Sequence, residues 1–294
     1  MKTVRPKLRH LLALLCLACS TSAFSKCLES GVQLQILGSG GPGDSGGRAS
    51  SGYLLWVDGV SRIMVDAGSG TKDQFHRAGA NSDDIDLVAL SHLHPDHSAE
   101  LPAIFWPAGG SFLISGPTGS DAFPSIERFL ELLMGADGAY AVLAPRMNLQ
   151  VTAVDVNARQ ATQIWGEENI LVNASAVPHG NVPTLAYKFE FAHTSIAFAS
   201  DQNGSDPAFI DFVRGVDYLV IHLTGTEDAT GVIAQLHAKP SVWGDMAASA
   251  DVGQVIVSHI SATTPAMLEE SLAIIRGHYA GPIVIGEDLM CIEL

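Results

Sequence analysis

The sequence predicts an α+β fold in which two β-sheets pack face to face, with helices on the outside. Predicted strands gather in two groups, at residues 32–65 and 149–199. Each group is followed by a stretch where strands and helices alternate, which is typical of sheets covered by helices. The sequence contains no short-period repeat, low-complexity segment or linker. Residues 26–294 are therefore predicted to form one domain, and about 269 residues suffice for a large core.

The elements of the first half are predicted from hydrophobic spacing and turn residues. Residues 52–57 and 61–65 are predicted as two strands joined at Asp58-Gly59, a strong hairpin signal. Apolar residues recur at helical spacing from Phe123 to Met134, which predicts an amphipathic helix. The same criteria predict the other strands at residues 32–37, 85–90 and 112–115, and the other helices at residues 72–80 and 99–106.

The second half begins with short β patterns and ends in strand–helix alternation. Asp206-Pro207 and Thr264-Pro265 each precede a helical pattern, because proline is favoured at the first helical position. The predicted helices are residues 208–214, 241–250 and 266–276. The predicted strands are residues 149–154, 161–165, 170–177, 185–190, 195–199, 217–221, 254–257 and 283–285.

Residues 1–25 are predicted to be a secretory signal peptide. A basic start is followed by the short apolar core of residues 11–18 and by small residues that suit cleavage near Ser25. Cys19 offers a lipoprotein alternative, which ranks second because Cys16 stands where an aliphatic residue is preferred. No other apolar run is long enough to cross a bilayer. The protein is therefore expected to be exported, either periplasmic or secreted.

The net charge indicates which partners are expected, and the cysteine positions indicate a disulfide. The formal net charge is −15, and it becomes −19 when the four basic residues of the signal peptide are removed. An acidic surface repels polyanions, so a nucleic-acid polymer is not the expected partner. Cleavage leaves only Cys27 and Cys291, in a compartment that allows disulfides. We predict a bridge between them, with two separate thiols as the alternative.

Three histidines and one aspartate fall within six residues directly after the predicted strand of residues 85–90. Pro95 argues against a continuous helix through them, so a loop at the end of a strand is expected. Imidazole and carboxylate together suit zinc, iron or manganese. A polar surface loop is the alternative, but this spacing favours a metal site. The four residues are His92, His94, Asp96 and His97.

Three further ligand-type residues stand just after predicted strands. They are His179, Asp201 and His259. A packed sheet can present residues at its strand ends to one shared cleft, and a metal site with an open position takes ligands from several chain segments. We therefore expect these three residues to complete the site.

After residue 25 the chain resembles the metallo-β-lactamase superfamily over nearly its whole length. Residues 92–97 match the HxHxDH signature of that family. Residues 37–41 (Leu-Gly-Ser-Gly-Gly), 65–70 (Val-Asp-Ala-Gly-Ser-Gly), 199–201 (Ala-Ser-Asp) and 258–259 (Ser-His), together with His179, occur in the family's order. The resemblance implies a four-layer αββα sandwich, in agreement with the strand and helix pattern.

The resemblance also implies a binuclear centre. Two zinc ions are the implied cofactors, although the ligand set also admits iron or manganese. Asp66 resembles the family's buried aspartate that orients a ligand histidine. A turn residue that caps Gly68 is the alternative reading of Asp66. The implied ligands are His92, His94 and His179 for the first metal, Asp96, His97 and His259 for the second, and Asp201 as the bridge.

Residues 37–41, 116–119 and 219–222 resemble the ribonuclease Z-like branch of the family. In that branch His237 lies where tRNA-processing members carry a catalytic histidine, which implies that it protonates the leaving oxygen. A surface histidine beside a helix is the alternative. Asp96 is counted with His237 as catalytic. His222 stands where relatives often carry an acid that holds the catalytic histidine, and it is left as either a substituted partner or a structural residue.

Two departures from the family narrow the expected substrate. tRNA-processing members insert a long basic arm where only 21 residues separate His179 from Asp201 here. Residues 121–170 offer no substitute, because they hold three Lys/Arg and seven Asp/Glu. tRNA maturation is therefore not expected. The commonest zinc β-lactamases carry a cysteine at the position of Asp201, so β-lactam hydrolysis is not expected either.

Exported phosphodiesterases and arylsulfatase-like members share three short motifs with this chain. These are residues 51–54 (Ser-Gly-Tyr-Leu), 97–100 (His-Ser-Ala-Glu) and 237–240 (His-Ala-Lys-Pro). The resemblance implies hydrolysis of a small anionic ester, a phosphodiester or sulfate ester, by a hydroxide held at the metal pair. A lactonase or thioesterase acting on carbonyl esters is the alternative enzyme. A metal-binding protein without catalysis is the alternative from another class.

Overall fold

The computed structural model describes residues 27, 29–158, 160–167, 169–261 and 264–294. The predicted signal peptide lies outside the described residues. Among the helices that are described, none is both long and apolar enough to cross a membrane.

The first sheet has seven strands in the order β14-β1-β2-β3-β4-β5-β6. It is mixed: β14, β1, β2 and β3 pair antiparallel, whereas β3 to β6 are parallel neighbours. The Asp58-Gly59 hairpin joins β2 to β3 as predicted. The strands are β1 (Val32–Gly38), β2 (Gly52–Val57), β3 (Val60–Val65), β4 (Leu87–Ala89), β5 (Gly110–Pro117), β6 (Met147–Val154) and β14 (Cys291–Glu293).

The second sheet also has seven strands, in the order β13-β12-β11-β10-β9-β8-β7. β7 to β10 pair antiparallel, and β10 to β13 are parallel. The strands are β7 (Thr162–Glu167), β8 (Ile170–Ala176), β9 (Leu185–Phe191), β10 (Ser195–Phe198), β11 (Tyr218–His222), β12 (Gln254–Ser258) and β13 (Ile283–Ile285).

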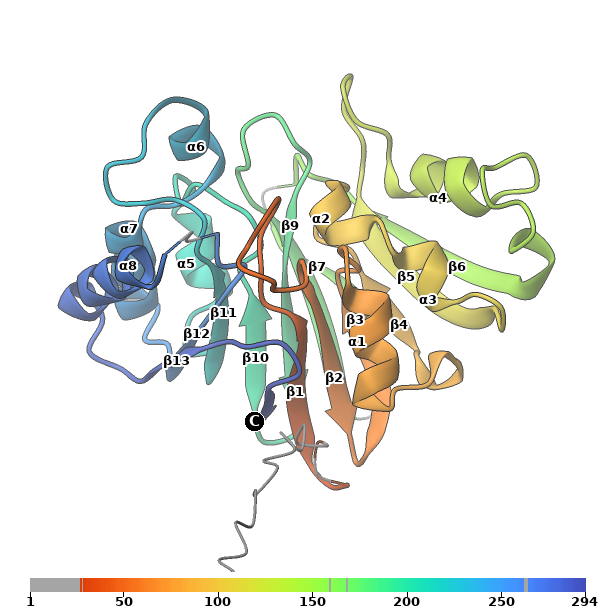
Figure 1. Cartoon of the computed structure of the whole chain (residues 1–294), viewed down its shortest axis with the longest axis horizontal. Coiled ribbons are helices and arrows are strands. Elements are labelled where there is room, and N and C mark those ends of the chain that lie inside the picture. Colours follow the sequence, from red (N-terminus) through yellow and green to blue (C-terminus); the bar gives the residue numbers. More distant parts are fainter. Residues whose placement is uncertain (1–26, 28, 159, 168, 262–263) are drawn as a thin grey trace, which may run out of the picture.

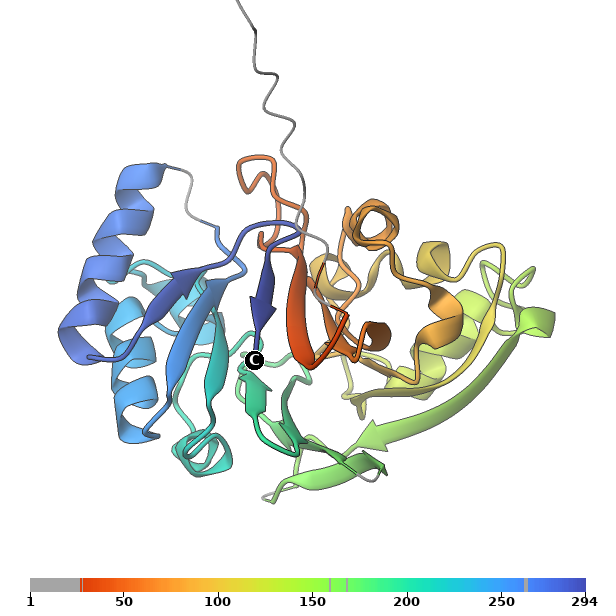
Figure 2. The same ribbon diagram turned by 90° about the horizontal axis from the view of Figure 1, so that it is seen from below.

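Helices cover the outer face of each sheet, as Figures 1 and 2 show. On the first sheet, Phe75 of α1, Leu101 of α3 and Leu130 of α4 are buried in one cluster with strand residues. On the second sheet, Phe209 of α5 and Trp243 of α7 are buried with strand residues. The helices are α1 (Thr71–Ala78), α2 (Pro95–Ser98), α3 (Leu101–Ile104), α4 (Ile126–Met134), α5 (Ala208–Phe212), α6 (Gly231–Leu236), α7 (Pro240–Ser249) and α8 (Pro265–His278), with short 3₁₀ turns η1 (Ser82–Asp84) and η2 (Ala144–Arg146).

A third apolar cluster fills the space between the sheets. Leu55 and Ile63 of the first sheet pack there with Phe189, Phe198 and Ile256 of the second. Apolar residues alternate along these strands, so one set faces the opposite sheet and the other faces the helices. The predicted αββα sandwich is confirmed.

Several element boundaries differ from the sequence prediction. Helix α4 begins at Ile126 rather than Phe123, because the Ser125 hydroxyl accepts a hydrogen bond from the Arg128 amide and caps the helix. Residues 95–98 form the short helix α2 where a loop is expected, since Pro95 takes the first helical position. Helix α6 is not predicted at all, because its six residues include no buried one to produce an apolar stripe.

The predicted bridge between Cys27 and Cys291 is confirmed, with Cα atoms 5.6 Å apart. It ties the N-terminus of the described domain to β14, the edge strand beside β1. A covalent link between distant positions restricts the unfolded chain. We therefore expect the Cys27→Ser/Cys291→Ser variant to lose about 2–5 kcal/mol of unfolding free energy.

Urea denaturation with and without dithiothreitol measures this effect. Reductant should lower the stability of the wild type to that of the double variant and leave the variant unchanged. Equal stability of the oxidised wild type and the variant would contradict a stabilising bridge.

Candidate metal centre

The predicted ligands gather at one end of the sandwich, the end marked in Figure 1 by α2 and α6. His92 follows β4 in the first sheet, whereas Asp201 follows β10 and His259 follows β12 in the second. Because carboxyl ends of neighbouring parallel strands meet at one edge, residues far apart in sequence come together. Ser200 and His259 have left-handed φ angles of 57° and 50°, and such strained conformations cluster at functional sites.

His92, His94 and His179 form the first group. Each offers a ring nitrogen, and the three nitrogens lie within 4.8 Å of one another. The Nδ1 of His179 lies 2.8 Å from the carbonyl oxygen of Leu236, to which it can donate. Its Nε2 is buried and has no hydrogen-bond partner within the described residues. A buried nitrogen in this state is suited to a metal ion.

His97, His259 and Asp96 lie together on the other side of the centre. The Nε2 atoms of His97 and His259 are 3.0 Å apart. The Oδ2 of Asp96 lies 3.3 Å from His259 Nε2 and 3.6 Å from His97 Nε2. Burial raises the pKa of Asp96, but its hydrogen bond with His259 and the nearby His97 outweigh this and lower it to about 2. Asp96 is therefore a carboxylate at neutral pH.

Asp201 lies between the two groups. Its Oδ2 is 4.0 Å from His92 Nε2 and 3.7 Å from His179 Nε2. The same Oδ2 is 3.6 Å from His97 Nε2, and Oδ1 is 3.5 Å from His259 Nε2. One carboxylate thus reaches histidines of both groups, which is the position that a bridging ligand requires. Although burial raises its pKa, His259 and His97 hold the pKa of Asp201 well below its usual value.

The expected contact between Asp66 and a ligand histidine is present. Asp66 Oδ2 lies 2.7 Å from His97 Nδ1, and the amide and hydroxyl of Ser91 both donate to the same carboxylate. Burial lowers the pKa of His97, but the charges of Asp66 and Asp201 raise it well above its usual value. A Cβ at Gly68 would collide with the Asp96 carbonyl, so glycine permits this close approach.

His222 contacts the central carboxylate, a role that the sequence left undecided. Its Nδ1 lies 2.8 Å from Asp201 Oδ1, and its Nε2 lies 3.2 Å from the hydroxyl of Tyr53. The ring stacks on His259 at 4.6 Å between centroids. Burial lowers the pKa of His222 to about 4, so the ring is neutral and donates from Nδ1. The sequence signal for this contact is the position of His222 at the end of β11.

Two other supporting contacts are absent from the sequence prediction. The Thr224 hydroxyl lies 2.8 Å from His259 Nδ1, and the Ser91 hydroxyl lies 3.1 Å from His92 Nδ1. Isolated serine and threonine residues are common, so no local pattern distinguishes these from surface hydroxyls. Only the folded arrangement identifies them as partners of the histidines.

His237 follows α6 and is buried beside the centre. Its Nδ1 faces Asp201 Oδ2 at 3.8 Å and has no hydrogen-bond partner within the described residues. Burial lowers the pKa of His237 to about 4, so the ring is neutral at pH 7. The surface alternative is therefore wrong. An acid role remains a prediction, and it requires an anionic ester nearby to raise the pKa of this ring.

A family model described as "Beta-lactamase superfamily domain" matches residues 61–260, which are 200 of the 294 residues. The chain belongs to the metallo-β-lactamase superfamily. It is similar to ribonuclease Z of Mycobacterium bovis (strain BCG / Pasteur 1173P2), with 25% identity over 281 residues, 90% of this chain and 98% of that protein. The predicted membership of the superfamily's ribonuclease Z-like branch is confirmed.

Solved structures of the superfamily share this fold. The metallo-β-lactamase fold protein YhfI from Bacillus subtilis matches with a TM-score of 0.71 and 19% identity, covering 90% of this chain and 99% of that chain. The short form of human tRNase Z (ELAC1) matches with a TM-score of 0.67 and 20% identity, covering 88% and 98%.

The donor set of this superfamily member fits divalent metal ions. Neutral imidazole is the form that binds metal, and burial lowers the pKa of His92, His94 and His179. His97, whose pKa the charges of Asp66 and Asp201 raise, would release its proton when a metal binds. His179 Nε2, which has no hydrogen-bond partner among the described residues, and the shared Asp201 carboxylate direct ligand atoms at the centre. The assignment of the seven predicted ligands to two metals remains a prediction that this geometry supports.

We expect His222→Leu to weaken metal retention by about 10–100-fold, because Asp201 would lose the donor that orients it. His222→Asn is the matched variant, since an asparagine amide can reproduce the Nδ1 donor. Chelator competition on the two proteins measures the difference. Wild-type affinity in the leucine variant would mean that His222 does not position Asp201.

Proposed function

We propose that this chain hydrolyses small phosphodiesters at two zinc ions held by the predicted ligands. It is a metal-dependent hydrolase acting on ester bonds, as predicted. One observation carries the binuclear proposal. The Asp201 carboxylate lies 3.5–4.0 Å from histidines of both groups, so a single side chain can serve two metals. Such a pair, when bound, supplies positive charge that activates water and stabilises the phosphoryl oxygens.

Other side chains would orient the ligands and transfer a proton. Asp201 would hold its orientation through the His222 and Tyr53 contacts. Asp66 would fix the ring of His97. His237, whose Nδ1 faces the centre and has no hydrogen-bond partner among the described residues, would carry a proton toward the leaving oxygen.

A phosphodiester is favoured over the other esters by the relatives, which are named ribonuclease Z. That name also counts against the expectation that nucleic acid is no partner. Two features support a small substrate nonetheless. Residues between His179 and Asp201 form the β9–β10 hairpin within the second sheet, where no separate arm extends from the described chain. The chain also carries a net charge of −15, which repels a polyanion.

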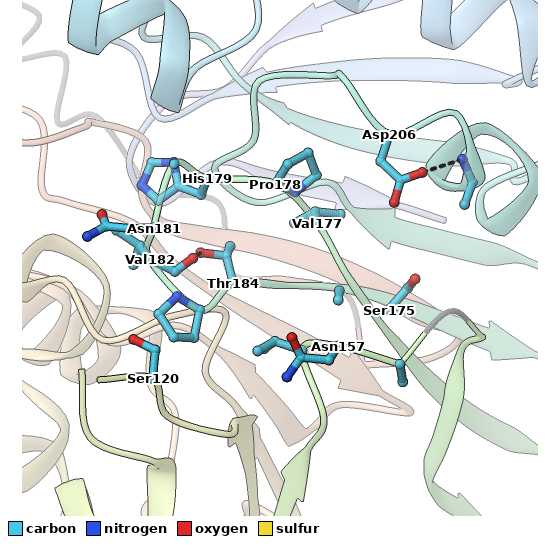
Figure 3. Close-up of a pocket in the computed structure, with 16 residues that line it drawn as sticks. Ser120, Asn157, Ser175, Val177, Pro178, His179, Asn181, Val182, Thr184 and Asp206 are labelled. Atoms are coloured by element: carbon cyan, nitrogen blue, oxygen red, sulfur yellow. Dashed lines mark hydrogen bonds between the residues drawn. The ribbon is translucent and has the colours of Figure 1, made fainter. Parts of the chain in front are cut away.

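A pocket of about 760 Å³ lies directly beside His179 (Figure 3). This volume is in the range of small-molecule sites. Its wall is the loop of residues 177–184, which also carries the ligand histidine. The pocket supports an enzyme that acts on small molecules. The predicted signal peptide supports a periplasmic or secreted location.

A substrate panel tests the proposal on zinc-loaded protein. We expect bis-(p-nitrophenyl) phosphate to be hydrolysed faster than p-nitrophenyl sulfate, a lactone series or a precursor tRNA, and metal analysis to find two zinc ions per chain. His97→Ala should abolish the activity and remove the second metal. Preference for a lactone, sulfate or tRNA, or full activity in His97→Ala, would refute the proposal.

A further inference from the structure

The pocket beside His179 carries polar groups that the catalytic centre does not use. The side chains of Asn181 and Ser175 make no hydrogen bond within the described residues, and both line the pocket. Asp206 also lines it, and its Oδ1 accepts from the Ala208 amide at 2.9 Å, which leaves Oδ2 available. In Figure 3 the Asp206 carboxylate and the Ser175 hydroxyl point toward the same part of the pocket.

The charge of this lining selects the kind of group that fits. Of the described lining residues, Asp206 carries the single charge, and none is lysine or arginine. A carboxylate repels a second anionic group and accepts hydrogen bonds from hydroxyls. Asn157 and Ser120 add an amide and a hydroxyl. Phe, Tyr and Trp side chains, which would favour a quaternary ammonium group, are absent from the described lining.

We propose that this pocket binds an uncharged, hydroxyl-bearing alcohol half of the phosphodiester, such as a glycerol or sugar group, with Asp206 accepting from its hydroxyls. The inference rests on the proposed phosphodiesterase function, because His179 belongs both to the pocket and to the first ligand group. The phosphate would then lie at the metal centre while the alcohol half lies against Ser175 and Asp206.

Two esters that differ only in hydroxyls test the proposal. They are 2,3-dihydroxypropyl p-nitrophenyl phosphate and propyl p-nitrophenyl phosphate. In both, attack of water on phosphorus breaks the bond to p-nitrophenolate and leaves a phosphomonoester. The 2-hydroxyl of the dihydroxypropyl ester can also attack phosphorus and give a cyclic phosphate, so phosphorus NMR separates the two products and only initial phosphomonoester formation is counted. Because hydrogen bonds to a charged acceptor discriminate strongly, we expect kcat/KM to be about tenfold higher for the dihydroxypropyl ester. A ratio near one would overturn the proposal.

Variants connect the preference to the pocket. Asp206→Asn and Ser175→Ala should each bring the ratio toward one. Asparagine can still accept from the Ala208 amide, so the turn before α5 keeps this hydrogen bond. Asp211→Asn is the matched control and should keep the tenfold ratio, since Asp211 lies within α5, five residues after Asp206, and pairs with Arg214. A ratio unchanged in both pocket variants would overturn the assignment.

A third ester, 2-carboxyethyl p-nitrophenyl phosphate, places a second anion in the same position. This arm is needed because Arg159, the residue after Ala158, lies outside the described residues. We expect the carboxyethyl ester to be slower than the propyl ester. A faster reaction would overturn the proposal in favour of an anion site. If none of the three esters reacts, the phosphodiesterase function itself fails, which is a different result from equal rates.

Discussion

Asp201→Ala should reduce the metal content from two ions to one or fewer per chain and lower phosphodiester hydrolysis by about 10³-fold or more. The physical reason is that this carboxylate lies within 4.0 Å of histidines from both groups. Its removal also leaves several buried imidazoles without their counter-charge. Inductively coupled plasma mass spectrometry and a bis-(p-nitrophenyl) phosphate assay measure the two effects.

Asp245→Ala is the matched control for Asp201. Asp245 also contacts a histidine, His278, at 2.8 Å, but both side chains are substantially exposed. This variant should retain two metals and wild-type activity. If Asp201→Ala kept both metals, a bridging role for Asp201 would be ruled out. The proposed role of His222, which is to orient Asp201 for metal binding, would then be ruled out as well.

Replacing His237 with alanine should slow the reaction in a way that depends on the leaving group. General acids contribute about 10²–10⁴-fold when the leaving oxygen needs a proton. We expect a loss of about 10²-fold or more for phenyl methyl phosphate and less than about tenfold for p-nitrophenyl methyl phosphate. The leaving group of the second ester, p-nitrophenolate, is a stabilised anion and needs little protonation.

Metal analysis of His237→Ala separates two roles. His237 lies with His179 and Asp201 in a group that could itself hold an ion, since Nδ1 is only 3.8 Å from Asp201 Oδ2. A proton donor leaves two metals in place when it is removed, whereas a ligand does not. Loss of metal, or an equal loss of rate on both esters, would therefore exclude the acid role.

Some of the side chains that hydrogen-bond to the predicted metal ligands and their neighbours can be recognised from sequence motifs, and others cannot. The contact of Asp66 with His97 was expected because Asp66 stands in a recognisable run, Val-Asp-Ala-Gly-Ser-Gly. The contact of Tyr53 with His222 joins residues 169 positions apart in opposite sheets. Tyr53 stands in the Ser-Gly-Tyr-Leu motif of residues 51–54, but that motif does not indicate its partner, so only sheet packing identifies the pair.

By itself, the sequence determined the layered fold, the family and the residues that gather at the centre. The layers and the gathered residues follow from strand periodicity and from histidines and carboxylates placed directly after strands. The family follows from the resemblance of residues 92–97 and the other motifs to the superfamily. The tertiary structure alone decided the orientation of His222, the burial of His237 and the pocket at Asp206. It also places Asp201, the bridge that the resemblance implies, within 4.0 Å of histidines from both groups. Those features depend on how two sheets and their loops approach in space, and on which side chains lose water, because hydrogen-bond partners and pKa shifts arise from neighbours that are distant in sequence.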